Sequence, residues 1–193
     1  MVVSIRVQSG VKMETWVDSE HIYRGKIISV RVGNVRLDNG SIAKREVVEH
    51  SGGVAIVPVR DEAVVLARQF RISVGREVIE LPAGKLEDQE TPRECALREL
   101  EEELGYRATQ LVLMTSYYSS VGFTNEKMYI FLGLGLERTK ERPEWDEQIQ
   151  TVEMPISEIE TKLSNSEFED SKTIIGLYEL MSYLRKHPEA IKS

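Results

Sequence analysis

Three glutamates lie close together on one predicted helix, and their arrangement is the clearest sign of chemistry in this chain. Glu99, Glu102 and Glu103 share one sector of a helix that turns about 100° per residue, beside a stripe of apolar side chains. Like charges three or four positions apart destabilise a helix by roughly 0.2–0.5 kcal/mol per pair. A bound cation would offset this repulsion, and hard carboxylate oxygens suit Mg²⁺ or Mn²⁺. We therefore predict a divalent-metal site on this helix.

The flanking residues predict where the helix begins and ends. Thr91 suits the N-cap, Pro92 the first helical position, and Glu94 completes a capping box. Gly105 follows the last apolar residue and suits the left-handed position after a helix. We therefore predict a helix over residues 92–104, with the glutamates in its C-terminal half, where the macrodipole also disfavours anions.

A short strand and a tight loop precede this helix. Residues 78–81 have the pattern of a strand, and residues 82–85 have the composition of a tight loop. Such a loop would fold its backbone back beside the acidic face of the helix. The backbone carbonyl of Ala83 is therefore a further candidate metal ligand, and Gly84 would permit the tight backbone.

The same segment resembles the Nudix box, the metal-binding motif of enzymes that hydrolyse a nucleoside diphosphate linked to another group. The matching positions are Gly84, Glu90 and the run from Arg98 to Tyr106, although the family prefers an aliphatic residue at the last of these. The resemblance implies that Mg²⁺, or Mn²⁺ in its place, is held by Glu99, Glu103 and the Ala83 carbonyl, with Glu102 as a third ligand or a base. Arg98 would pair with Glu102 or Glu90 and orient the ligands.

The rest of the chain is similar to one Nudix branch, the ADP-ribose or ADP-sugar pyrophosphatases, which would release AMP and a sugar phosphate. One departure is Val121, where the branch usually carries proline. It keeps open other nucleotide sugars such as ADP-glucose, a dinucleotide such as NADH, and, from a different class, a non-catalytic ADP-ribose sensor. The similar segments are residues 23–27, 45–50, 68–71, 122–126 and 146–149.

Other residues are assigned to the site by this resemblance, each with a plain structural alternative. Glu147 lies in a charged loop and is predicted to bind metal or to deprotonate the attacking water, with Glu144 or Asp146 as substitutes. Arg71 is predicted to contact the substrate phosphates, because its planar fork suits two oxygens. Less specific candidates are His50 on the phosphate path, Phe123, Trp16 and Tyr23 for stacking on adenine, and Glu80 near the metal.

Composition narrows the function class. The chain has 193 residues and a net charge of −7, and no basic stripe that would neutralise nucleic-acid phosphates. Its single cysteine, Cys95, excludes an intramolecular disulfide and is expected to be an inert helix residue. No apolar stretch approaches membrane-spanning length. We therefore expect a cytoplasmic enzyme without nucleic-acid or membrane partners.

The predicted fold is α/β, a Nudix-type α/β/α sandwich with a mixed sheet, plus a small N-terminal antiparallel β-sheet domain. Residues 1–50 would form that N-terminal sheet and residues 51–193 the catalytic domain. A sheet of three strands is marginal alone, and the resemblance implies that it packs across a two-fold axis in a homodimer. The predicted strands are 27–32, 34–37, 42–50, 54–59, 63–67, 110–117, 127–136 and 148–154, and the second helix is 171–186.

Overall fold

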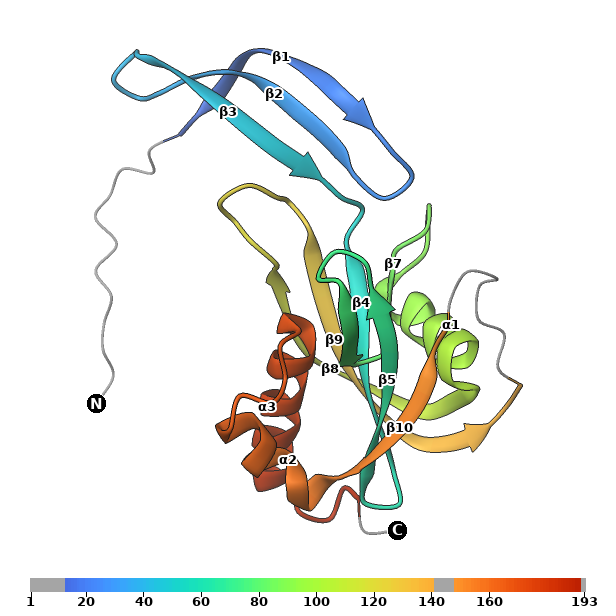
Figure 1. Cartoon of the computed structure of the whole chain (residues 1–193). Helices are drawn as coiled ribbons and strands as arrows, with labels where there is room; N and C mark the ends of the chain where they lie inside the picture. Colours follow the sequence, from blue (N-terminus) through green and yellow to red (C-terminus); the bar gives the residue numbers. More distant parts are fainter. Residues whose placement is uncertain (1–12, 141–147, 192–193) are drawn as a thin grey trace, which may run out of the picture.

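The computed structural model describes residues 13–140 and 148–191, and it contains two sheets with helices around the larger one (Figure 1). The elements are β1 (Thr15–Arg24), β2 (Ser29–Arg36), β3 (Ile42–Glu49), β4 (Gly53–Arg60), β5 (Ala63–Arg71), β6 (Arg76–Glu80), β7 (Ala83–Lys85), α1 (Pro92–Leu104), β8 (Tyr106–Tyr118), β9 (Lys127–Arg138), β10 (Gln150–Pro155), α2 (Ile156–Ser164) and α3 (Ser171–Lys186). The α/β fold with a separate N-terminal antiparallel sheet is confirmed.

The N-terminal sheet has the order β1-β2-β3, and its strands differ from those predicted. The prediction of two strands at 27–32 and 34–37 is wrong, because one continuous strand, β2, runs through residues 29–36 and includes parts of both segments. Gly33 in its middle lets β1 approach closely, since a Cβ there would lie 2.2 Å from the Asp18 carbonyl oxygen. The first strand, β1, was not predicted, and two register shifts interrupt its pairing with β2.

The larger sheet runs β10-β5-β4-β9-β8, with β6 added to β5 and β7 to β4. It is mixed because β4 and β9 are parallel, whereas its other pairs are antiparallel. Alternate residues of the buried strand β4 point to opposite faces. Val54 and Ile56 pack with Leu100 of α1, and Val57 packs with Leu177 of α3. Helix α1 therefore covers one face and α2 with α3 the other, which gives the predicted α/β/α sandwich (Figure 1).

Two short elements, one beside α1 and one on the opposite face of the sheet, were missing from the prediction. The loop predicted at 82–85 contains β7, which pairs with the start of β4 and is thereby fixed to the central sheet. Helix α2 follows β10 directly, and its buried Ile159 and Leu163 join the core next to α3. Within the described residues no helix is both long enough and apolar enough to cross a membrane.

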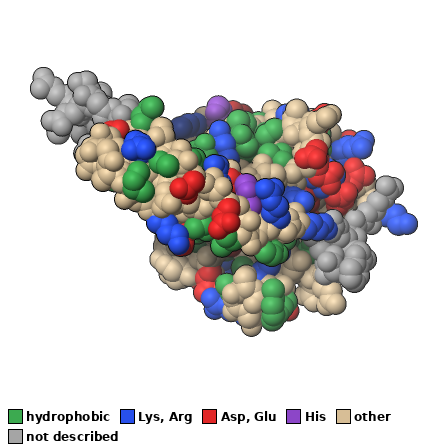
Figure 2. Space-filling view, turned by 90° about the horizontal axis from the view of Figure 1, so that it is seen from above, with side chains coloured by type: hydrophobic (Ala, Val, Ile, Leu, Met, Phe, Trp, Pro, Cys, Tyr) green, Lys and Arg blue, Asp and Glu red, His purple; other side chains and the backbone are tan. Residues whose placement is uncertain are grey.

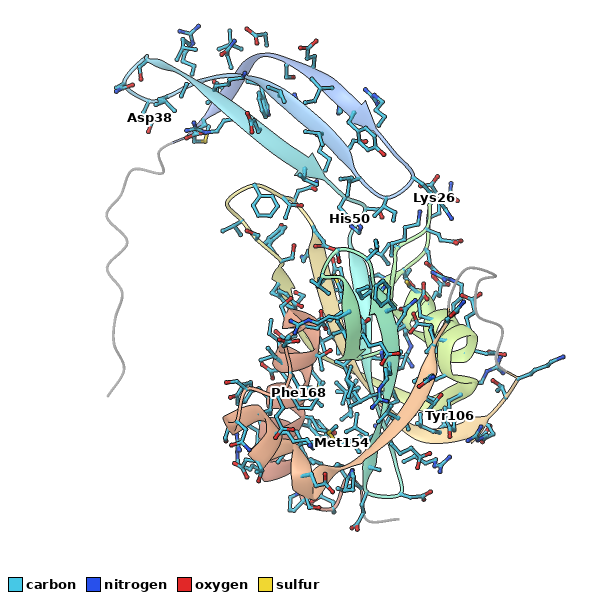
Figure 3. All side chains as sticks on the ribbon, in the orientation of Figure 1. Lys26, Asp38, His50, Tyr106, Met154 and Phe168 are labelled. Carbon is cyan, nitrogen blue, oxygen red and sulfur yellow. The ribbon has the colours of Figure 1, made fainter. Side chains whose placement is uncertain are left out.

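The two sheets meet where the β8–β9 loop contacts the end of β3. The backbone N–H of Val48 donates to the Phe123 carbonyl at 2.7 Å, and the N–H of Asn125 donates to the Val48 carbonyl at 3.3 Å. His50 lies at this junction, between the upper sheet and the central one (Figure 3), and its N–H donates to Asn125 Oδ1 at 2.9 Å. Backbone hydrogen bonds thus connect the N-terminal sheet to the rest of the chain.

Candidate active site

Helix α1 begins and ends as its sequence predicts. The Thr91 hydroxyl accepts a hydrogen bond from the Glu94 N–H at 3.3 Å, and the Glu94 carboxylate accepts one from the Thr91 N–H at 2.9 Å. Gly105 has a φ of 65°, and its N–H donates to the Glu101 carbonyl at 3.0 Å. The apolar stripe of α1 is buried against the sheet. These caps and contacts fix the direction in which the glutamates project.

Tyr106, directly after α1, is the aromatic residue at a position where the Nudix box prefers an aliphatic one. Its side chain is fully buried in the hydrophobic cluster on the α1 face, and the guanidinium groups of Arg60 and Arg138 lie 5.5 and 4.9 Å from its ring centre. Its hydroxyl accepts a hydrogen bond from Arg60 Nη1, and it projects from the α1 side of the sheet (Figure 3). An aromatic residue is therefore accommodated here because its polar end has a partner.

Arg98 is the centre of the acidic cluster. Its Nε and Nη2 donate to the two carboxylate oxygens of Glu90 at 2.8 and 2.9 Å. Its Nη1 donates to Glu99 Oε1 at 2.7 Å and to Glu102 Oε2 at 3.0 Å. The hydrogen bond from Arg98 lowers the pKa of Glu90 to about 2, and the Glu90 bond in turn raises the pKa of Arg98. One guanidinium therefore balances three carboxylates, and both pairings considered for it occur together.

Glu103 points to the strand that precedes the helix. Its side chain is only 7 % exposed, and its Oε2 accepts a hydrogen bond from the Ala83 N–H at 3.2 Å. Ala83 belongs to β7 and is held in register with Ala55 of β4. The backbone of Ala83 and the Glu103 carboxylate are therefore neighbours, as the sequence predicts for two members of one site.

Gly84 provides the space in which the Glu99 carboxylate lies. A Cβ at this position would be 1.8 Å from Glu99 Oε1 and 2.0 Å from its carboxylate carbon. The side chain of any other residue would therefore displace the carboxylate or the strand. This close approach is the local reason for a glycine at the start of the motif.

The residues fit a divalent cation by the chemistry of their donors. Glu99, Glu102, Glu103 and the Ala83 carbonyl supply hard oxygen ligands within one short segment of structure. In the described part of the chain, no group of three His, Cys, Asp or Glu side chains already has the arrangement of a metal site. The carboxylates of Glu99 and Glu102 accept hydrogen bonds from Arg98, and that of Glu103 accepts one from the Ala83 N–H of β7.

A second charged cluster surrounds Glu80 and includes a residue that sequence reasoning missed. Arg71 Nε donates to Glu80 Oε1 at 2.6 Å, and Lys172 Nζ lies 2.5 Å from Glu80 Oε2. The Glu80 hydrogen bond is the largest cause of a raised pKa at Arg71, and the charge of Glu103 raises it further. Arg71 is therefore within the electrostatic reach of the acidic helix. Only the general preference for a partner at a buried carboxylate could have indicated Lys172.

The other predicted residues are more dispersed. His50 lines a groove of about 730 Å³ with Lys26, Lys85 and Glu87, between the N-terminal sheet and the segment before α1. The backbone of Lys85 also accepts a hydrogen bond from Arg98, at 3.3 Å, which links this groove to the acidic cluster. Phe123 is exposed on the β8–β9 loop. Figure 2 shows acidic and basic side chains gathered on the side of the molecule where α1 lies.

The two aromatic candidates of the N-terminal sheet lie on β1. Trp16 stacks beneath the Arg31 guanidinium, which lies 4.4 Å from the ring centre, and Tyr23 is exposed on the same strand. Glu147, with its substitutes Glu144 and Asp146, lies outside the described residues.

Comparison with known proteins decides the family. Residues 49–174, which include α1, β7 and the Glu80 cluster, match the model of the NUDIX domain. This chain belongs to the Nudix family. The match covers both the acidic helix and the strands that position it, and the protein is a Nudix pyrophosphatase.

The relatives of this Nudix protein extend the match over most of the chain. It is 39 % identical to an ADP-ribose pyrophosphatase of Bacillus subtilis, over 86 % of this chain and 92 % of that one. It is 36 % identical to an ADP-ribose pyrophosphatase of Mycobacterium tuberculosis, over 83 % and 80 %. It is also 35 % identical to a methanol dehydrogenase activator of Bacillus methanolicus, over 86 % and 92 %. The solved structure of an ADP compounds hydrolase shares the fold, with a TM-score of 0.83 at 20 % identity over 93 % and 98 %.

Proposed function

We propose that this Nudix pyrophosphatase hydrolyses the pyrophosphate bond of ADP-ribose or a related ADP-sugar, releasing AMP and a sugar phosphate. The observation that carries the proposal is the cluster of carboxylates that Arg98 and Gly84 hold beside β7. The choice of an ADP-sugar is supported by relatives named ADP-ribose pyrophosphatase at 39 % and 36 % identity. For ADP-ribose the sugar phosphate would be ribose 5-phosphate.

The residues of α1 and β7 would hold Mg²⁺, with Mn²⁺ as the alternative. The proposed ligands are Glu99, Glu102, Glu103, the Ala83 carbonyl and Glu147. When bound, such ions neutralise charge on the phosphates and acidify a coordinated water. Arg98 keeps the carboxylates oriented, because its guanidinium donates hydrogen bonds to Glu90, Glu99 and Glu102 at once. Glu102 or Glu147 would accept the proton of the attacking water.

Arg71, His50 and Phe123 are proposed to contact the substrate. Arg71 is 41 % exposed, and Glu80 fixes its Nε, so the remaining donors of its planar fork are suited to phosphate oxygens. His50 lines the groove next to Lys85, whose backbone contacts Arg98. Phe123 presents an exposed ring on the β8–β9 loop, which is hydrogen-bonded to β3 of the N-terminal sheet, and a nucleobase could stack there.

Two observations bear on the choice of nucleotide sugar. Val121 replaces the branch proline and is highly exposed, and two relatives are named GDP-mannose pyrophosphatase, at 33 % and 32 % identity over 71 % and 73 % of this chain. Another nucleotide sugar or a dinucleotide is therefore the alternative. A non-catalytic ADP-ribose sensor is disfavoured, because binding alone does not require the complete set of carboxylates on α1.

Incubating the protein with Mg²⁺ and ADP-ribose and measuring released AMP tests the activity. A panel of ADP-ribose, ADP-glucose, GDP-mannose and NADH then tests the preference. We expect the largest kcat/KM for ADP-ribose. A larger value for GDP-mannose or NADH would contradict the ADP-sugar preference, whereas binding of ADP-ribose with no AMP formed would favour the sensor.

We also propose that residues 1–50 form a dimerisation domain and residues 51–193 the catalytic domain of a homodimer. The N-terminal sheet has three strands, which is marginal for an isolated sheet. Several of its apolar side chains are exposed in the single chain, and a second copy would cover them. These exposed residues are Trp16, Val17, Ile22, Tyr23 and Ile42.

A further inference from the structure

A lysine from α3, far from the Nudix motif in sequence, holds one side of the buried Glu80. The Glu80 side chain is 4 % exposed, and each of its oxygens faces a cation: Arg71 Nε at 2.6 Å and Lys172 Nζ at 2.5 Å. A buried carboxylate requires such partners, because an unpaired buried charge is strongly destabilising. Glu80 therefore depends on Lys172 as well as on Arg71.

The first turn of α3 is bound to the segment that leads from Glu80 to the acidic helix. Asp170, the N-cap of α3, accepts a hydrogen bond from the Thr173 N–H at 3.0 Å and lies 3.1 Å from Lys172 Nζ. The Thr173 hydroxyl accepts a hydrogen bond from the Leu81 N–H at 2.9 Å. Two residues beyond Leu81, the Ala83 N–H reaches Glu103. Lys172 is thus held in a fixed position beside this segment.

The charges of this cluster are balanced. Arg71 and Lys172 supply two positive charges, and Glu80 and Asp170 supply two negative ones. Loss of the Lys172 charge would leave one net negative charge beside Arg71, on which Glu103 and Asp170 also act. An anionic phosphate group would then approach a less favourable local field, and Glu80 would hold the guanidinium more tightly.

We propose that Lys172 is a positioning residue for phosphate binding: it balances Glu80 so that the Arg71 guanidinium stays oriented and available to the pyrophosphate group. This inference rests on the proposed phosphate-binding role of Arg71. It does not depend on which nucleotide sugar is preferred, since all of the candidates carry a pyrophosphate. Lys172 acts through Arg71 and takes no part in the reaction itself.

Steady-state kinetics with Mg²⁺ and ADP-ribose tests the inference. We expect Lys172→Met to raise KM roughly tenfold with kcat within about twofold, because binding is lost equally in the ground and transition states. Lys172→Arg should restore KM to within about threefold, since it returns the charge. Adding Glu80→Gln to Lys172→Met should also lower KM towards the wild-type value, because the uncompensated carboxylate is removed.

Three outcomes would overturn it: an unchanged KM in Lys172→Met, a loss confined to kcat, or no recovery in the double variant. Should Lys172→Met fail to fold, Lys172→Gln, which keeps a hydrogen-bond donor without the charge, carries the same expectation. If the wild type prefers another nucleotide sugar, the wild-type panel reveals that failure, and the same variants are measured on the better substrate.

A spectroscopic measurement without metal separates positioning from general destabilisation. The Arg71 Nε–H resonance, assigned with Arg71→Lys, should shift in metal-free Lys172→Met protein. The control is Lys162→Met on α2. Lys162 Nζ lies 2.8 Å from Glu167 Oε2 in an exposed ion pair that shares no residue with the Glu80 cluster. We expect the control to leave both the Arg71 resonance and KM unchanged. An Arg71 signal that is the same in both variants would contradict the inference.

Discussion

At the scale of single residues, Glu103 and Glu101 differ in role although they are two positions apart on α1. Glu103 is buried and bonded to Ala83, whereas Glu101 pairs at 3.4 Å with the exposed Arg107. We expect Glu103→Gln to lower kcat at least about a hundredfold with folding intact, because a metal ligand is lost while its shape is kept. Glu101→Gln should keep kcat within about twofold. Near-normal turnover of Glu103→Gln, measured as AMP release, would refute the metal assignment.

The Arg98–Glu90 pair makes a prediction about acid stability. Arg98 lowers the pKa of Glu90 from 4.5 to about 2. The pair therefore contributes its full stabilisation above about pH 4.5, and this contribution disappears as the pH falls towards 2. Urea unfolding over this range should therefore show the stability advantage of wild type over Glu90→Gln shrinking as the pH is lowered. An advantage that stays constant across the range would contradict the pairing. Arg98 itself stays charged throughout.

At the scale of elements, the capping box of α1 links the sequence to the site. The Thr91 side chain accepts a hydrogen bond from the Glu94 N–H at the N-terminal end of α1, the helix that carries the proposed metal ligands further along. Thr91→Ala should lower the free energy of unfolding by about 1 kcal/mol, as measured in urea. Thr91→Ser keeps the hydroxyl and should be close to wild type. Equal stability of the two variants would show that this cap contributes little.

Elements defined by local patterns were predictable, whereas those defined by tertiary contacts were not. Helix α1 and the pairing of Arg98 with Glu102 follow from caps and from a spacing of four residues. The register shifts of β1 and the pairing of β7 with β4 depend on partners distant in sequence. The same holds for Lys172, which meets Glu80 across 92 positions. A sequence shows that a buried glutamate requires a cation but not which one supplies it.

At the scale of the whole molecule, the N-terminal sheet is joined to the catalytic sheet along a narrow contact. Val48 and His50 exchange hydrogen bonds with the β8–β9 loop, while β1 forms the outer edge of its sheet (Figure 1). The unpaired edge and the exposed apolar side chains of β1 make it the surface at which we propose that a second chain binds. The loop that carries Phe123 is bonded to this sheet, so assembly and substrate binding are expected to be coupled through it.

A single substitution on β1, Ile22→Glu, tests the proposed dimer. Ile22 is 61 % exposed, and its replacement by glutamate should keep the chain at its monomer mass of 22.0 kDa in analytical ultracentrifugation, whereas the wild type should sediment at twice that mass. A buried charge at a symmetric interface is repeated in both subunits, so its cost is doubled. Tyr178→Glu on α3 is the matched control, because Tyr178 is 55 % exposed but lies outside the N-terminal sheet. The control should remain dimeric. A monomeric wild type would exclude the dimer. A dimeric Ile22→Glu variant would show that the interface lies outside β1.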